Sequence, residues 1–171
     1  MKFLAMSLIG MLMIGGCKKE NGVDGVVMEA DINLYVVDEN GKNLLKDGQK
    51  ADGLRLYYIV DGVEKEVWNP NLDNERNFSI ENYQGEGKYK GEPLLKVVAN
   101  TIDQATTTKL LLKWNDSTVD TLTTELTRKG SSLWVTNIWL NGDIVWTPEI
   151  GKEKYNNGEI TGLPNLIQIV K

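Results

Sequence analysis

Hydrophobic and polar residues alternate along most of the chain after about residue 30, and this period of two predicts β-strands. The first such stretch covers residues 31–38, where Ile32, Leu34 and Val36 alternate with their neighbours before a Glu-Asn-Gly turn. Further strands are expected at residues 54–60, 63–68, 78–83, 94–100, 106–114, 118–127, 133–140, 143–146 and 166–170. No segment of ten residues has a convincing helical period, so the domain is predicted to be built from strands.

Short turns predict hairpins between consecutive strands. The dipeptides Asp61-Gly62 and Asn141-Gly142 favour two-residue turns, because their residues tolerate the positive φ angles that such turns need. A further hairpin is expected around Asn115-Asp116, between two segments rich in β-branched threonine. Pairing across Asp61-Gly62 places Val60 opposite Val63 and gives that hairpin one mostly apolar face.

The hairpin around Asn141-Gly142 is expected to be apolar on both faces. The face expected in the core carries Leu133, Val135, Trp139, Ile144 and Trp146. The opposite face carries Trp134, Thr136, Ile138, Leu140, Asp143 and Val145. A loop or residues 166–170 must cover this second face, or it meets a partner, because monomers seldom leave a large apolar patch in water.

Five residues are candidates for ligand binding. Trp134, Ile138 and Val145 lie on this second face, where an aromatic ring can stack on a sugar or anchor a protein. Arg55 and Trp68 are expected side by side on the half-solvated face of the Asp61-Gly62 hairpin.

The number and spacing of the strands predict the fold class. Roughly eight short strands separated by turns are typical of an antiparallel β-sandwich, of immunoglobulin-like or transthyretin-like type. A lipocalin-like barrel is the alternative, since strand periodicity does not distinguish the two architectures. Residues 29–171 are expected to form this single domain.

The start of the chain predicts where the domain resides. Lys2 precedes an apolar run over residues 3–14, which has the length of a signal-peptide core and is short for a membrane-spanning helix. The run ends in Ile14-Gly15-Gly16-Cys17, which resembles the bacterial lipobox. This resemblance implies that residues 1–16 are removed and that Cys17 is acylated. Two or three acyl chains would give stable anchoring, because each buried methylene contributes about 0.8 kcal/mol.

The layout of a lipobox, a polar tether and an opening strand resembles small Bacteroidetes-type lipoproteins with a β-sandwich domain. Residues 17–28 correspond to the lipidated cysteine and a flexible tether. The Lys18-Lys19-Glu20 sequence partly matches the surface-export signal of such lipoproteins, which favours lysine followed by two acids. The resemblance implies an exported protein at the outer membrane or cell surface.

Composition limits the partners. The chain has 19 Lys+Arg and 24 Asp+Glu, a formal net charge of −5, which loss of Lys2 makes one unit more negative. This sign argues against nucleic acid and anionic membrane surfaces as partners. Cys17 is the single cysteine, so its acylation leaves no disulfide and the domain must rely on its core.

Several chemistries are excluded by missing residue types. The chain contains no histidine, which removes Ser-His-Asp catalysis and His-ligated zinc, and it lacks P-loop and dinucleotide fingerprints. Asn69, Asn71 and Asp73 have the spacing of the front half of a calcium loop. Asn74 replaces the turn glycine of such a loop and Ile80 its bidentate acid, so no metal or other cofactor is expected.

The sequence therefore favours a non-catalytic binding or interaction module for protein or glycan, attached to the membrane through Cys17. One alternative is a small hydrolase that uses two carboxylates, which a cleft with two nearby acids would favour. Another is a structural subunit that assembles by strand addition, which an unpaired edge beside residues 166–170 would favour.

Overall fold

The computed structural model describes residues 26–46, 53–71, 75–115, 117–162 and 165–171. The signal peptide, Cys17 and most of the tether lie outside these residues, as do Asp73 and Asn74 of the calcium-loop comparison.

Eleven strands and one helix form the described part of the chain. In chain order they are β1 (Met28–Glu29), β2 (Asp31–Val37), β3 (Arg55–Val60), β4 (Val63–Glu66), β5 (Phe78–Asn82), β6 (Pro93–Val98), β7 (Thr107–Lys113), β8 (Val119–Lys129), β9 (Ser132–Leu140), β10 (Asp143–Trp146), α1 (Pro148–Asn156) and β11 (Leu166–Val170). The ten segments named as strands in the sequence analysis all contain strands, with bounds that shift by a few residues. β1 was not expected, and the total exceeds the roughly eight strands predicted for the sandwich.

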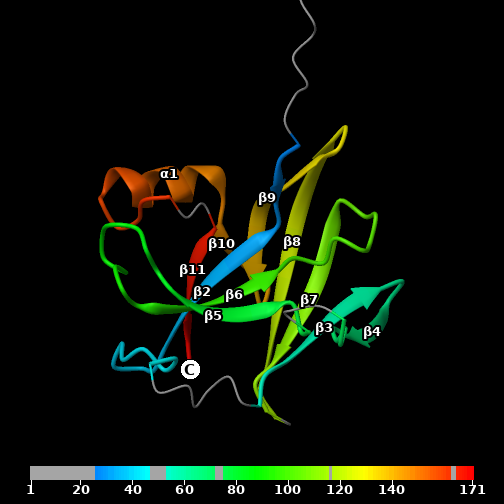
Figure 1. Ribbon diagram of the computed structural model, residues 1–171, viewed down its shortest axis with the longest axis horizontal. Coiled ribbons are helices and arrows are strands. Elements are labelled where there is room, and N and C mark those ends of the chain that lie inside the picture. Colours follow the sequence, from blue (N-terminus) through cyan, green and yellow to red (C-terminus); the bar gives the residue numbers. More distant parts are fainter. Residues whose placement is uncertain (1–25, 47–52, 72–74, 116, 163–164) are drawn as a thin grey trace, which may run out of the picture.

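The strands form two sheets (Figure 1). The larger sheet has the order β1-β9-β8-β7-β3-β4, with β10 also paired to β9, and the smaller has the order β11-β2-β6-β5. Among the described residues these sheets do not close into a barrel, so the lipocalin-like alternative is wrong and the arrangement is consistent with a β-sandwich. The sheets are mixed rather than fully antiparallel, because β1 runs parallel to β9 and β11 parallel to β2.

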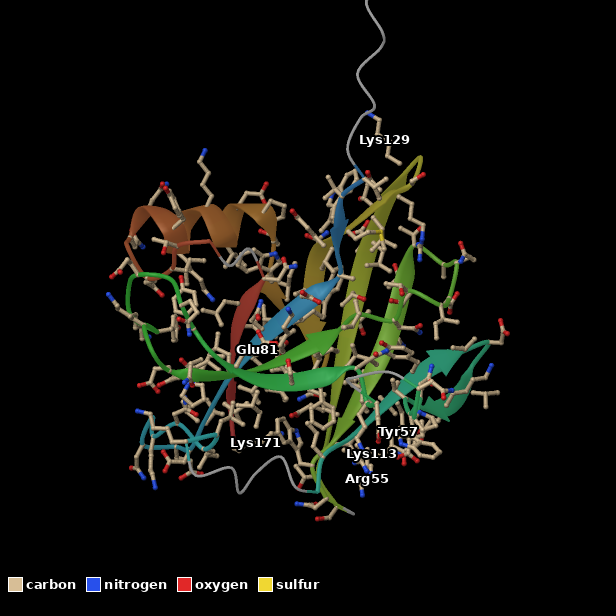
Figure 2. All side chains as sticks on the ribbon, viewed as in Figure 1. Arg55, Tyr57, Glu81, Lys113, Lys129 and Lys171 are labelled. Carbon is tan, nitrogen blue, oxygen red and sulfur yellow. The ribbon has the colours of Figure 1, made fainter. Side chains whose placement is uncertain are left out.

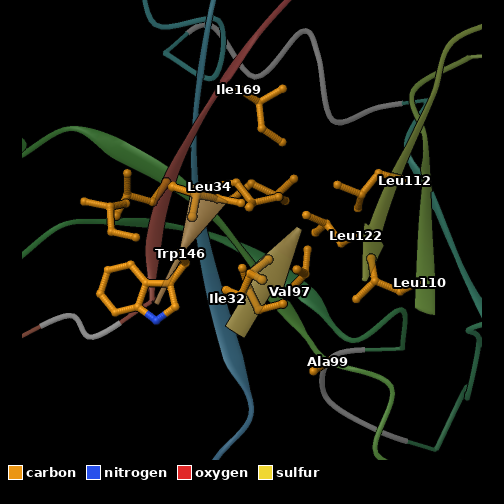
Figure 3. Packing of buried hydrophobic residues seen from close by; sticks show 14 of the residues in the cluster. Ile32, Leu34, Val97, Ala99, Leu110, Leu112, Leu122, Trp146 and Ile169 are labelled. Atoms are coloured by element: carbon orange, nitrogen blue, oxygen red, sulfur yellow. The ribbon is translucent and has the colours of Figure 1, made fainter. Parts of the chain in front are cut away.

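The core lies between the inner faces of the two sheets (Figure 3). Ile32, Leu34 and Val97 of the smaller sheet are fully buried. Leu110 and Leu122 of the larger sheet belong to the same buried cluster. Removal of this apolar surface from water is the main stabilising contribution to the fold, at about 25 cal/mol per Å².

Both predicted two-residue turns are present. Asp61 and Gly62 have φ angles of 54° and 76°, and Asn141 and Gly142 have 53° and 100°. Two successive positive φ angles define the turn type whose twist matches that of paired strands. Val60 lies opposite Val63, as expected.

The expected faces of the last hairpin are wrong in part. A register irregularity between Glu125 and Leu126 of β8 leaves Thr136 of β9 without an opposite residue. Beyond this bulge the alternation is inverted, so Ile138 is fully buried in the core. Trp139, expected in the core, lies opposite Thr123 on the outer face of the sheet and is half-buried.

A second irregularity separates Ile144 from Trp146 in β10. Trp146 is buried as expected, but it pairs with Ile138 instead of Asn137. Ile144, expected in the core, is exposed, whereas Val145, expected on the second face, packs against the core.

The helix α1 was not predicted, although its boundaries carry recognisable signals. Thr147 accepts a hydrogen bond from the Ile150 amide, Pro148 occupies the first turn, and Glu149 and Lys154 complement the helix dipole. Its nine residues include Gly151, which faces the Trp146 ring. Contacts with other elements hold α1 in place: Gly151 lies against the Trp146 ring, Ile150 packs against the core, and Lys154 donates to the Leu166 carbonyl.

Candidate ligand-binding groove beside Trp68

A groove opens beside the β3–β4 hairpin, where the strands extend to the edge of the larger sheet. Its volume is about 340 Å³, and its lining includes Tyr58, Trp68, Asn69, Glu75, Asn77 and Ile102. We call it the Trp68 groove. Strand β4 is the end strand of its sheet and is exposed along its whole length, which leaves this side of the hairpin open to solvent.

Trp68 is the main apolar group of the groove. Its side chain is 59% exposed, although tryptophan is usually the residue with most to gain from burial. The indole Nε1 donates a hydrogen bond to Glu75 Oε2 at 3.3 Å, and the Asn69 amide donates to the Glu75 carbonyl at 2.7 Å. Glu75 therefore orients the ring while leaving its surface in water.

Ile102 supplies a second exposed apolar side chain, at 65% exposure. The segment that carries it is held from both sides. The Asn100 amide donates to the Ile59 carbonyl at 2.8 Å, and the Arg128 guanidinium donates to the carbonyls of Asp103 (2.8 Å) and Ala105 (3.0 Å). Ile102 thus projects from an anchored loop.

The floor of the groove joins the two sheets. The Tyr58 hydroxyl donates to the Val98 carbonyl at 3.1 Å and lies 3.5 Å from the amide nitrogen of Asn77. Burial raises the pKa of Tyr58, and the hydrogen bond from Asn77 lowers it by less. The hydroxyl therefore stays protonated over the physiological range and serves as a fixed polar group.

Arg55 belongs to the outer face of the sheet, next to Tyr57 and Lys113 (Figure 2). Its Nε lies 3.6 Å from Glu66, a residue that also lines the groove. Lys113 pairs with Glu64 at 2.6 Å and lies 4.1 Å from the centre of the Tyr57 ring. Arg55 was expected beside Trp68. In the structure Glu66 connects the two, because it pairs with Arg55 on the outer face and also lines the groove that contains Trp68.

The other three candidate residues are not part of this groove. Trp134 lies opposite Glu29 of β1 and is half-buried at the far edge of the larger sheet. Ile138 and Val145 pack in or against the core, so their proposed exposure to a ligand is wrong. Of the five candidates, Trp68 alone lines the groove.

Sequence reasoning missed Glu75, Asn77 and Ile102. They lie in connecting segments between strands. In such segments neither the hydrophobic period nor the turn type predicts which side chains lie close together in the fold. An isolated isoleucine within a polar connection was the single available signal at Ile102.

The arrangement suits a ligand with both apolar and hydroxyl-bearing surfaces. An exposed aromatic ring offers a flat apolar platform, and Asn69, Glu75 and Asn77 place amide and carboxylate groups in the same groove. Within the ranges described, no group of three or more acidic residues could hold a metal ion. No helix in that part of the chain is long and apolar enough to cross a membrane.

Comparison with protein-family models, curated proteins and solved structures found no match to this chain.

Proposed function

We propose that the protein is an exported, lipid-anchored binding module that recognises a glycan in the Trp68 groove. The observation that carries the proposal is Trp68 itself, with a ring that is 59% exposed yet oriented by Glu75. A sugar ring presents C–H groups that pack on an indole face, while its hydroxyls exchange hydrogen bonds with amides and carboxylates.

The size of the groove favours a glycan over a protein ligand. A volume of about 340 Å³ lies near the lower end of the range of about 300–1,000 Å³ that small-molecule sites occupy. A stable protein interface buries about 800 Å² on each partner. The groove therefore suits a short glycan.

Location and fold type belong to the same proposal. Anchoring rests on the resemblance of residues 14–17 to a lipobox. The assignment to an immunoglobulin-like or transthyretin-like sandwich is supported by two facing sheets and by a chain that passes from β1 in one to β2 in the other.

The experiment compares glycan binding by the wild-type chain with that of Trp68→Ala, on an array of polysaccharide fragments followed by calorimetry. We expect Trp68→Ala to bind at least tenfold more weakly, a loss of about 1.4 kcal/mol. Tyr155→Ala is the matched control, because Tyr155 is another exposed aromatic residue (61%) and lies outside the groove. Wild-type affinity in Trp68→Ala would contradict the proposal.

A hydrolase is the second candidate, because Glu66 and Glu75 both line the groove. Glycoside hydrolysis commonly uses two carboxylates on either side of the bond that breaks. Incubating bound glycans with the wild type and with Glu75→Gln, and measuring new reducing ends, separates the two functions. Turnover that Glu75→Gln abolishes would favour the hydrolase.

Assembly by strand addition has less support. Strand β11 does lie at the end of its sheet, where a further strand could pair. However, the Lys154 amine donates to the outward carbonyl of Leu166 at 2.8 Å, which occupies the start of that edge. Burial lowers the pKa of this amine, and its half-buried position fixes it against the strand.

A further inference from the structure

Three consecutive apolar residues are exposed where the described chain begins. Val26, Val27 and Met28 have exposures between 42% and 63%. Single exposed apolar residues are ordinary on a protein surface, whereas a contiguous group commonly marks a contact with another phase or molecule.

These residues are held against the turn between β8 and β9. The Val27 amide donates to Ser132 Oγ at 3.0 Å, and the Leu133 amide donates to the Val27 carbonyl at 2.7 Å. A broad groove of about 930 Å³ lies among them, and its lining includes Val26, Val27, Lys129, Ser131 and Trp134. We call this region, residues 26–28 with residues 129–134, the tip.

The tip is the part of the domain nearest to the proposed anchor. Residues 18–25 separate Cys17 from Val26, and so short a segment reaches at most about 30 Å when fully extended. Figures 1 and 2 show β1, the β8–β9 turn and Lys129 together at one end of the molecule. A short attachment at this end keeps the tip at a high effective concentration near the lipid.

We infer that the tip rests on the membrane surface that holds the anchor, with Val26 and Met28 at the level of the lipid headgroups and with Trp134, which lines the same groove as Val26, close to that level. This inference rests on the proposed anchoring through Cys17. Tryptophan favours the membrane interface, where its ring is apolar and its N–H remains hydrated.

Charge specifies which kind of lipid surface fits. Lys129 of the tip and the adjacent Glu29 line the same groove and carry opposite charges, and the whole chain has a net charge of −5. Attraction to anionic lipid is therefore weak. The apolar side chains make the contact, which is expected on neutral phosphatidylcholine vesicles and changes little with salt.

The experiment uses the exported protein, expressed from the full sequence, purified after processing by the cell and mixed with phosphatidylcholine vesicles. Cys17 is the single cysteine, so its acylation leaves an introduced cysteine as the one free thiol. An environment-sensitive fluorophore attached to Ser131→Cys lies at the tip. The same fluorophore attached to Ser117→Cys lies just before the first residue of β8, at the other end of that strand. Both serines are exposed, and β8 has 11 residues, which separates the two positions by about 35 Å.

We expect the Ser131→Cys probe to be quenched at least twofold by lipids that carry a nitroxide near the headgroup, with a blue-shifted emission. The Ser117→Cys probe should remain unquenched and should emit at the wavelength that the fluorophore has in water. The additional changes Val26→Asp and Met28→Asp should reduce quenching at Ser131→Cys to the level of the control, since charges resist entry into the interface.

Two results would overturn the inference, and they are distinguishable. Acylated protein with equal quenching at both positions would contradict the orientation alone. Protein that carries no fatty acid and does not sediment with vesicles would contradict the proposed anchor, and the orientation with it. Fatty-acid labelling of the same samples separates these outcomes.

Discussion

Asp120 in β8 is a buried carboxylate with polar partners at both oxygens. Oδ2 accepts a hydrogen bond from the Trp114 indole at 2.7 Å and pairs with the Lys171 amine, while Oδ1 accepts from the Asn141 amide at 2.9 Å. The Lys171 backbone amide also donates to the Val37 carbonyl of the smaller sheet at 2.8 Å. Asp120 thereby links both sheets.

Asp120→Asn should destabilise the fold by about 3 kcal/mol, because it leaves the buried Lys171 amine without its counter-charge. Urea denaturation measures the loss. Asp61→Asn is the control, since Asp61 is exposed in a turn whose positive φ asparagine also adopts. Equal stability of the two variants would contradict this account of the cluster.

The same cluster predicts a pH dependence. Burial raises the pKa of Asp120, but the hydrogen bonds from Asn141, Lys171 and Trp114 together lower it below its ordinary value. A carboxyl with a lower pKa in the folded state stabilises the fold above its unfolded pKa of about 3.9, and that contribution is lost as the pH falls further.

Chemical denaturation between pH 7 and pH 2 should therefore show wild type and Asp120→Asn converging as the pH decreases below about 4. A constant difference in unfolding free energy across this range would exclude Asp120 as the titrating group.

At the scale of elements, residue 151 of α1 allows a comparison of two effects on stability: the helix propensity of the residue and its packing on Trp146. Alanine in place of glycine inside a helix ordinarily stabilises it by about 0.5–1 kcal/mol. A Cβ on Gly151, however, would lie 2.2 Å from the Trp146 ring. Gly151→Ala should therefore lower stability by about 1–3 kcal/mol through overpacking.

Thermal denaturation of Gly151→Ala beside Lys152→Ala, an exposed neighbour in the same helix, gives the comparison. The lysine variant should melt within a degree or two of the wild type. A higher melting temperature for Gly151→Ala would show that the helix and the ring move apart easily.

The strands could be predicted from the sequence because each depends on local alternation and local turns. The faces of β9 could not, because the bulge at Thr136 depends on how β8 and β9 align, and alignment is a property of the pair. Because of this one unmatched residue, Ile138 lies in the core and Trp139 on the outer face, the reverse of what the alternation predicts. Helix α1 was missed for a related reason, since its contacts with Trp146 and Leu166 join it to other elements and an apolar period along the helix does not report them.

The candidate site was predictable at one residue. Trp68 was identified as part of the half-solvated face of the Asp61-Gly62 hairpin, although β4 ends before it. The groove needs Glu75 and Ile102 as well. These come from separate connections that meet after the sheets have packed. Arg55 was assigned to the same surface, and the structure places it on the outer face behind Glu66.

At the scale of the whole molecule, the resemblance of residues 14–17 to a lipobox predicts its attachment. Cys17→Ala should prevent acylation, because the thiol is the group that receives the lipid, and the precursor should then escape cleavage by the lipoprotein peptidase. Metabolic labelling with a fatty acid and fractionation of membranes measure both effects. Cys17→Ser is the closest control in size, and fatty-acid label in either variant would contradict the assignment.

The crossing of the chain from β1 to β2 has a mechanical consequence. A pull on the proposed anchor first loads residues 26–29. These are held by two residue pairs with β9, Met28 with Leu133 and Glu29 with Trp134, and by the hydrogen bonds of Val27 described above. Beyond Ala30, whose carbonyl accepts from the Ala99 amide at 2.8 Å, the load reaches β2 between β11 and β6. The few contacts of residues 26–29 should break before the sheets themselves are strained, and they then release this segment, which spans about 13 Å when extended. For a domain attached as proposed, this segment acts as an extensible link that lengthens under load while the core stays intact.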